Sequence, residues 1–150
     1  MYKADTIRIG GKGLVRSVTL GGDAPIAVQT MWKQPLREDT LAETVRKIAE
    51  LEQLGCDILR FAVPDAPSAE AFVKLTRITP MPLVADIHFD YRLALRCMDG
   101  DAAKIRINPG NIGTEERVKA VIQKAQDTGT VLRIGVNTGS LPADLRNRME

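Results

Sequence analysis

Apolar residues follow two alternating patterns along this chain, short continuous runs and longer stretches in which they recur at helical spacing. The continuous runs predict strands, and the spaced positions predict amphipathic helices between them. Strand and helix alternate in this way from about residue 26 to the end of the chain. The predicted strands cover residues 26–31, 57–63, 83–87, 103–107 and 131–136.

Turn and capping residues mark the ends of the predicted helices. Asp39 or Thr40 is a candidate cap for the first helix and Gly55 its stop, while Thr114 and Gly129 bound the last complete one. The helices between them cover 68–78 and 91–98. A glycine-rich turn at 10–13 joins two short runs, 6–9 and 14–19, which predict a hairpin before the first unit. Residues 142–150 predict the beginning of a further helix.

Strands that alternate with helices predict a parallel sheet, and near-continuous apolar strands fit a sheet that is buried. Five units of about 30 residues fall short of the roughly 250 that a complete (β/α)₈ barrel needs. An open doubly wound sheet is the alternative, but no glycine-rich phosphate loop follows the first strand. We therefore expect an α/β fold, in which residues 1–150 form the amino-terminal, substrate-binding part of a TIM barrel after a short hairpin.

Composition indicates the class of protein but does not indicate which reaction or ligand is involved. Of the 150 residues, 44% are hydrophobic and 27% charged, and the formal net charge is +2, which predicts a globular domain that binds neither nucleic acid nor a membrane. The first residues lack the apolar core of a secretory signal. Cys56 and Cys97 lie far apart in sequence and outside any CxxC pattern, so we expect reduced thiols in a cytoplasmic protein.

Polar residues on four consecutive predicted strands share one parity. Because side chains alternate along a strand, the apolar Leu132, Ile134 and Val136 should face the helices and leave Arg133 on the opposite face. The same alternation applies to the other strands, although it leaves Gln29, Met31 and Trp32 unassigned. The predicted inward residues are Ile58, Arg60 and Ala62; Val84, Asp86 and His88; Lys104, Arg106 and Asn108; and Arg133, Gly135 and Asn137.

Three inward arginines near the carboxyl ends of barrel strands predict an anion site, since catalytic residues gather at that end of TIM barrels. The arginine fork suits phosphate oxygens. An internal salt-bridge network with Asp86 is the alternative, although three arginines outnumber one carboxylate. His88 is the sole histidine and shares the parity of Asp86, which favours a catalytic position. Lys104 lies deeper and fits an interior layer.

Several motifs in register resemble the 4-hydroxy-3-methylbut-2-enyl diphosphate synthase family. They are residues 84–92 (VADIHFDYR), 105–113 (IRINPGNIG) and 133–141 (RIGVNTGSL), together with 21–25 (GGDAP) and 55–60 (GCDILR). The resemblance runs in order from about Ile7 to Leu145. It implies an enzyme of the non-mevalonate isoprenoid pathway that reductively opens 2-C-methyl-D-erythritol 2,4-cyclodiphosphate to (E)-4-hydroxy-3-methylbut-2-enyl diphosphate.

The same resemblance implies a [4Fe-4S] cluster, ferredoxin or flavodoxin as electron donor, and a homodimer at full length. By motif, Arg60, Arg106 and Arg133 would hold the diphosphate with Asn108 and Asn137 beside them. Asp86 and His88 would meet the ring hydroxyls or the leaving oxygen.

Two features limit what the resemblance transfers. The cluster ligands would belong to a carboxyl-terminal domain outside these residues, because neither cysteine matches them, so the chain alone is expected to be inactive. Residues 31–36 depart from the family pattern and receive no role. The alternatives are another barrel enzyme that acts on a phosphorylated small molecule without a cluster, and a non-catalytic half barrel.

Overall fold

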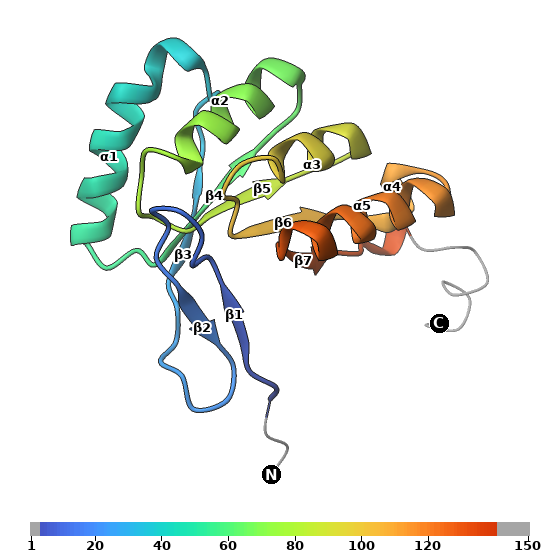
Figure 1. Cartoon of the computed structure of the whole chain (residues 1–150), viewed down its shortest axis with the longest axis horizontal. Coiled ribbons are helices and arrows are strands. Elements are labelled where there is room, and N and C mark those ends of the chain that lie inside the picture. The colour runs from blue at the N-terminus through green and yellow to red at the C-terminus, as the bar shows by residue number, and fades with distance from the viewer. Residues whose placement is uncertain (1–3, 141–150) are drawn as a thin grey trace.

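A computed structural model describes residues 4–140 as two layers, a parallel sheet and a row of helices (Figure 1). The sheet strands are β3 (Gln29–Trp32), β4 (Ile58–Ala62), β5 (Leu83–Asp86), β6 (Lys104–Ile107) and β7 (Val131–Ile134). The α-helices are α1 (Leu41–Gln53), α2 (Ala66–Thr76), α3 (Tyr91–Cys97), α4 (Pro109–Ile112) and α5 (Glu115–Thr128). The antiparallel strands β1 (Ile7–Ile9) and β2 (Val18–Leu20) form a separate hairpin.

The order of the strands decides between the two predicted architectures. The five-stranded sheet runs β3-β4-β5-β6-β7, so each strand pairs in parallel with the next one in the sequence. Helices α1, α2, α3 and α5 all cover the same face (Figure 1). A doubly wound sheet has a strand order that reverses and helices on both faces. The sequential order with one helical layer is the arrangement of a TIM barrel, which confirms the predicted fold class.

Element boundaries differ from the prediction mainly where the chain enters and leaves the sheet. The first sheet strand begins at Gln29 instead of residue 26, because Ile26 is 95% exposed and pairs with nothing in the sheet. The hairpin strands are also shorter than expected. α2 starts two residues early, where Asp65 accepts a hydrogen bond from the backbone of Ser68 at 2.8 Å. The short helix α4 was not predicted at all. The helix expected over 142–150 lies outside the described residues.

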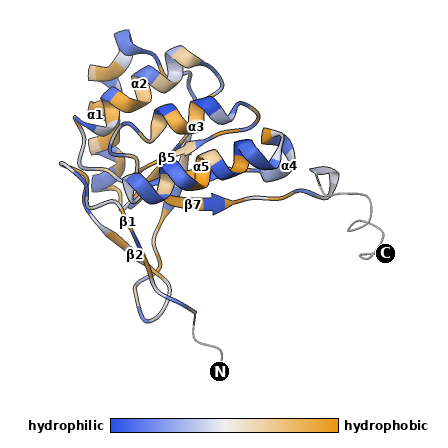
Figure 2. Cartoon of the chain, turned by 45° about the vertical axis from the view of Figure 1, so that its right-hand side comes forward, coloured by the Kyte–Doolittle hydropathy of each residue, from blue (hydrophilic) through white to orange (hydrophobic). Residues whose placement is uncertain are grey.

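The helix-facing side of the sheet forms the main core. Leu59, Phe61, Ala85 and Ile105 are at most 1% exposed and pack against helices α1, α2, α3 and α5. Phe61 stacks on Trp32 with ring centroids 5.5 Å apart and meets Phe72 of α2 edge-on at 6.2 Å. Figure 2 shows apolar segments gathered between the two layers. The predicted outward parity of strands β4, β5 and β6 is therefore confirmed.

Strand β7 departs from the parity prediction. Leu132 packs against the main core, but Ile134 and Val136 are 56% and 60% exposed. The expectation that both would pack outward is wrong for the described chain. The physical reason is that no α-helix follows β7 among residues 4–140, where only a short 3-10 turn over Thr138–Ser140 comes after it.

The hairpin closes the amino-terminal end of the sheet on the face away from the helices, which we call the inner face. Ile9 of β1 is 1% exposed and packs with Ile58, Val84 and Ala103, and we call this cluster the floor. The turn that follows β1 is anchored as well, since Arg16 donates to the carbonyl of Cys56 at 3.1 Å. Within the described part of the chain, the hairpin thus covers the amino-terminal end of the inner face and leaves its carboxyl-terminal end uncovered. No helix among the described residues is long and apolar enough to span a membrane.

Candidate anion site

Strand pairing places the predicted polar residues at matching levels of the inner face. Asp86 pairs with Arg106, which in turn pairs with Arg133 on β7. Arg60 pairs with Met31 on one side and Val84 on the other, one level closer to the floor. Because side chains of paired residues point to the same face of a sheet, these side chains share the inner face. Met31 and Gln29, which the sequence left unassigned, belong to this face too.

Asp86 joins two of the three arginines. Its carboxylate is fully buried; its Oδ2 accepts from both Nε (3.0 Å) and Nη2 of Arg60, and its Oδ1 accepts from Nη1 of Arg106 at 3.3 Å. The side chains of Arg60 and Arg106 remain 24% and 14% exposed. The salt-bridge network considered from the sequence therefore exists, but it occupies only two of the inward cations.

The remaining inward cations give the site its positive charge. Arg133 is exposed and makes no hydrogen bond or ion pair with any other described residue. Lys104 is 7% exposed and donates to Oε1 of Gln29 at 3.3 Å. Burial, and then the charges of Arg133 and Arg60, lower the pKa of Lys104. Four cationic side chains thus share the inner face with one carboxylate, an excess that fits an anionic ligand.

His88 lies just beyond the end of β5. Its Nε2 is 4.0 Å from Oδ2 of Asp86, and its side chain is 48% exposed. The ring therefore stands at the rim of the site with one edge toward the buried carboxylate and one open to solvent. This position lets the imidazole contact a ligand that is held by the arginines.

The two predicted asparagines serve different purposes. Asn108 is fully buried; its Oδ1 accepts from the backbone of Gly110 at 3.1 Å and its Nδ2 donates to Oγ of Ser140 at 3.0 Å. The Ser140 hydroxyl donates in turn to the carbonyl of Asn137 at 2.8 Å. Asn108 therefore ties together the loops after β6 and β7, whereas the exposed Asn137 presents its amide to the rim. No pattern in the sequence predicted this role of Ser140.

Gly135 allows Arg106 to reach Asp86. A Cβ atom at position 135 would lie 2.6 Å from Nε and 2.7 Å from Nη2 of Arg106. Such distances are far inside van der Waals contact. The guanidinium of Arg106 therefore lies across the backbone of β7 where only glycine leaves room. Gly135 was predicted to face inward, but this reason for it could not be read from the sequence.

Replacing Gly135 with alanine is expected to displace the Arg106 guanidinium from Asp86. The added methyl group should cost about 1–3 kcal/mol of unfolding free energy, the range typical of overpacking. Urea denaturation measures this loss. Gly139→Ala is the matched control, since a Cβ there meets no heavy atom within 4 Å. Equal stability of both variants would contradict the close approach.

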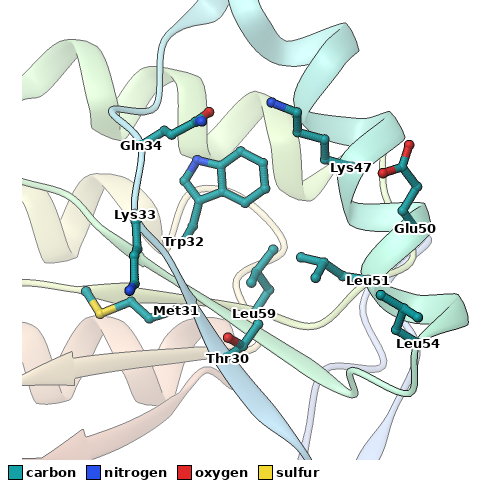
Figure 3. Close-up of a pocket in the computed structure, with 10 residues that line it drawn as sticks. All are labelled: Thr30, Met31, Trp32, Lys33, Gln34, Lys47, Glu50, Leu51, Leu54 and Leu59. Atoms are coloured by element: carbon teal, nitrogen blue, oxygen red, sulfur yellow. The ribbon is translucent and has the colours of Figure 1, made fainter.

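A cavity lies on the helical face of the sheet, beside its edge strand β3. It occupies about 440 Å³ between β3 and α1, where Trp32 and Leu59 point toward Leu51 and Leu54 (Figure 3). Leu59 belongs to the main core, which places this cavity on the helical face. None of the three inward arginines lines it, so it is distinct from the candidate anion site.

The described residues offer no obvious metal centre. No group of three or more His, Cys, Asp or Glu side chains among them is arranged to hold a metal ion. Cys56 and Cys97 are both buried, and burial raises the pKa of the Cys97 thiol to about 12. Such a thiol is a poor source of the thiolate that clusters require. These residues do not fit a [4Fe-4S] cluster.

The chain is similar to known proteins over nearly its whole length. The family described as the GcpE TIM-barrel domain matches residues 11–150. A 4-hydroxy-3-methylbut-2-en-1-yl diphosphate synthase (flavodoxin) of Treponema denticola is 68% identical over 145 residues, covering 97% of this chain and 38% of the relative. Proteins of the same name from Treponema pallidum and Clostridium tetani are 68% and 47% identical, covering 94% and 99% of this chain.

The matches cover most of this chain but less than half of each relative. The chain spans 38%, 35% and 41% of the length of these three relatives. The family match covers nearly all of the chain, including every sheet strand and each predicted site residue. Together with the sequential parallel sheet, it shows that this chain belongs to the GcpE TIM-barrel domain family.

Proposed function

We propose that this chain is the substrate-binding barrel portion of a 4-hydroxy-3-methylbut-2-en-1-yl diphosphate synthase. The observation that carries the proposal is the excess of inward cations over the single carboxylate Asp86, at the open end of the sheet. A cyclic diphosphate is a compact anion that such a cluster would attract. The names of the relatives support the same substrate class.

In this proposal each site residue has a distinct task. Arg133 and Arg106 donate to the phosphate oxygens, because Arg133 is unengaged within the described residues and Arg106 keeps donors beyond the one used on Asp86. Arg60 supports them from the other side of the carboxylate. Asp86 fixes both arginines, and His88 at the rim meets a ring hydroxyl or the leaving oxygen.

The rest of the reaction depends on parts beyond these residues. A [4Fe-4S] cluster, held by ligands outside them, would supply the electrons for opening the ring. Flavodoxin is the proposed electron donor, with ferredoxin as the other candidate, and the working form is proposed to be a cytoplasmic homodimer. The 150 residues alone are expected to be inactive.

Calorimetric titration of 2-C-methyl-D-erythritol 2,4-cyclodiphosphate into the longest natural protein that contains this chain tests the proposal. Arg106→Ala and Arg133→Ala should each weaken binding by about 1–3 kcal/mol, as expected for hydrogen bonds to charged groups. Arg77→Ala is the control, because Arg77 donates to the carbonyl of Asp99 in a different part of the fold. Unchanged affinity in both site variants would rule out this assignment of the phosphate site.

A further inference from the structure

Lys104 is a buried cation for which the described structure provides no anionic partner. It is 7% exposed, and its only hydrogen bond within residues 4–140 goes to the amide oxygen of Gln29. An ammonium group has three donors, and burying it without a counter-ion is costly. The one carboxylate on the inner face, Asp86, is already shared by Arg60 and Arg106. Within residues 4–140, Lys104 therefore lacks the compensation that buried charges normally have.

The groups around Lys104 add further positive charge without adding a counter-ion. Gln29 faces it from β3, Arg60 from β4 and Arg133 from β7, and the paired residues on β5 and β7 are the apolar Val84 and Val131. Both arginines repel the ammonium, which adds to the effect of burial in lowering the pKa of Lys104. Its surroundings thus favour either loss of the proton or the arrival of an anion.

The position of Lys104 along β6 indicates which part of a bound anion its ammonium would contact. Lys104 lies two residues before Arg106 on the same face of the strand, next to the floor formed by Ile9, Ile58, Val84 and Ala103. A ligand that enters from the open carboxyl-terminal end passes Arg133 and Arg106 before it reaches Lys104. The ammonium therefore lies one level deeper than the guanidinium-bearing positions Arg106 and Arg133, at the level of Arg60.

We propose that Lys104 is an anion-binding residue at the bottom of the site, where its ammonium donates to the phosphate group that reaches deepest between the strands. The inference rests on the proposed function only in requiring that the site binds a phosphorylated anion. It adds a residue that the sequence had placed in an interior layer.

This contact has a consequence for pH. A bound anion stabilises the charged ammonium, so it raises the pKa of Lys104 above the value in the free protein. Binding is therefore strongest below the pKa of the free state and weakens as the pH rises through it, since the ammonium must then be protonated on binding. Arginine remains charged throughout this range and contributes no such dependence.

Titration of inorganic pyrophosphate into the longest natural protein that contains this chain tests the inference. Lys104→Met should reduce the affinity by about tenfold or more, the equivalent of one hydrogen bond to a charged group. Lys119→Met is the matched control, because Lys119 lies on the surface of α5 and pairs only with Glu115 at 2.8 Å among the described residues. The Lys119→Met substitution removes the same charge. It should change the affinity by less than about twofold, because salt screens the effect of a distant surface charge.

Sulfate provides a second measurement that does not depend on the stability of the variant. Its charge is constant at alkaline pH, so its affinity for the wild-type protein should fall as the pH rises from about 8 to 11, through the titration of a lysine. A flat profile would overturn the inference, as would a Lys104→Met variant that binds pyrophosphate like wild type. If Lys104→Met bound pyrophosphate like wild type but Arg133→Ala lost binding, the inference about Lys104 would fail and the proposed function would stand. Failure of the wild-type protein to bind pyrophosphate would contradict both.

Discussion

Replacing Asp86 with asparagine is expected to lower the free energy of unfolding by about 3–5 kcal/mol, the cost typical of removing one partner from a buried ion pair. The carboxylate is fully buried and accepts hydrogen bonds from two arginines, so the neutral amide would leave Arg60 and Arg106 without their counter-charge. Urea denaturation of wild type and variant, monitored by circular dichroism, measures the difference.

Asp99→Asn is the control for this substitution. Asp99 also accepts from two cations, Arg96 at 3.0 Å and Lys124 at 2.6 Å, but its side chain is 38% exposed. Solvent screens exposed pairs, so this variant should lose about 1 kcal/mol or less. If both variants lost the same amount, the central place of Asp86 in the inward cluster would be wrong. Pyrophosphate should restore part of the stability of Asp86→Asn, since it supplies negative charge between the same arginines.

Replacing His88 with alanine is expected to reduce kcat by about 10²–10⁴-fold, the usual contribution of a positioned acid or base. The ring is the only imidazole in the 150 residues and stands half-exposed at the rim, 4.0 Å from the Asp86 carboxylate. Because the side chain is 48% exposed, the fold should tolerate its removal. Steady-state turnover of the cyclic diphosphate, measured with reduced flavodoxin on the longest natural protein that contains the chain, gives kcat and KM.

The division between kcat and KM distinguishes catalysis from simple binding. A catalytic His88 predicts a large fall in kcat with KM changed much less, whereas a residue that only binds substrate predicts the reverse. Asn137→Ala is a useful comparison, because Asn137 is exposed on the same rim without an ionisable group. A His88→Ala enzyme with wild-type kcat would exclude the proton-transfer role.

Alternation along the strands allowed much of the fold and the inward residues to be predicted from the sequence. The strands β4, β5 and β6 are covered on the helical side, and every residue predicted to face the helices there is buried. The prediction failed where that cover is absent. Ile26 precedes β3 and is exposed, and Ile134 at the end of β7 and Val136 just after it have no described α-helix above them. Apolar character alone does not show whether a neighbouring element is present to bury a side chain.

The interactions within the site were harder to predict than its position. Parity placed Asp86 beside the arginines but could not show that Arg60 and Arg106 occupy it while Arg133 stays free. The room that Gly135 leaves for a guanidinium depends on a side chain from the neighbouring strand. The link from Asn108 through Ser140 joins residues 32 positions apart. Such contacts depend on rotamers and loop geometry, which periodic patterns do not encode.

The turn after β1 has a consequence for the order in which this barrel can assemble. Lys12 donates to the hydroxyl of Thr130 at 2.7 Å, a contact between residues 118 positions apart. At a synthesis rate of roughly 5–20 residues per second, Thr130 is made roughly 6–24 s after Lys12. During that interval the hairpin can dock only on the earlier strands, through Arg16 and the carbonyl of Cys56. The turn after β1 can therefore complete its contacts only after β6 and α5 have been synthesised.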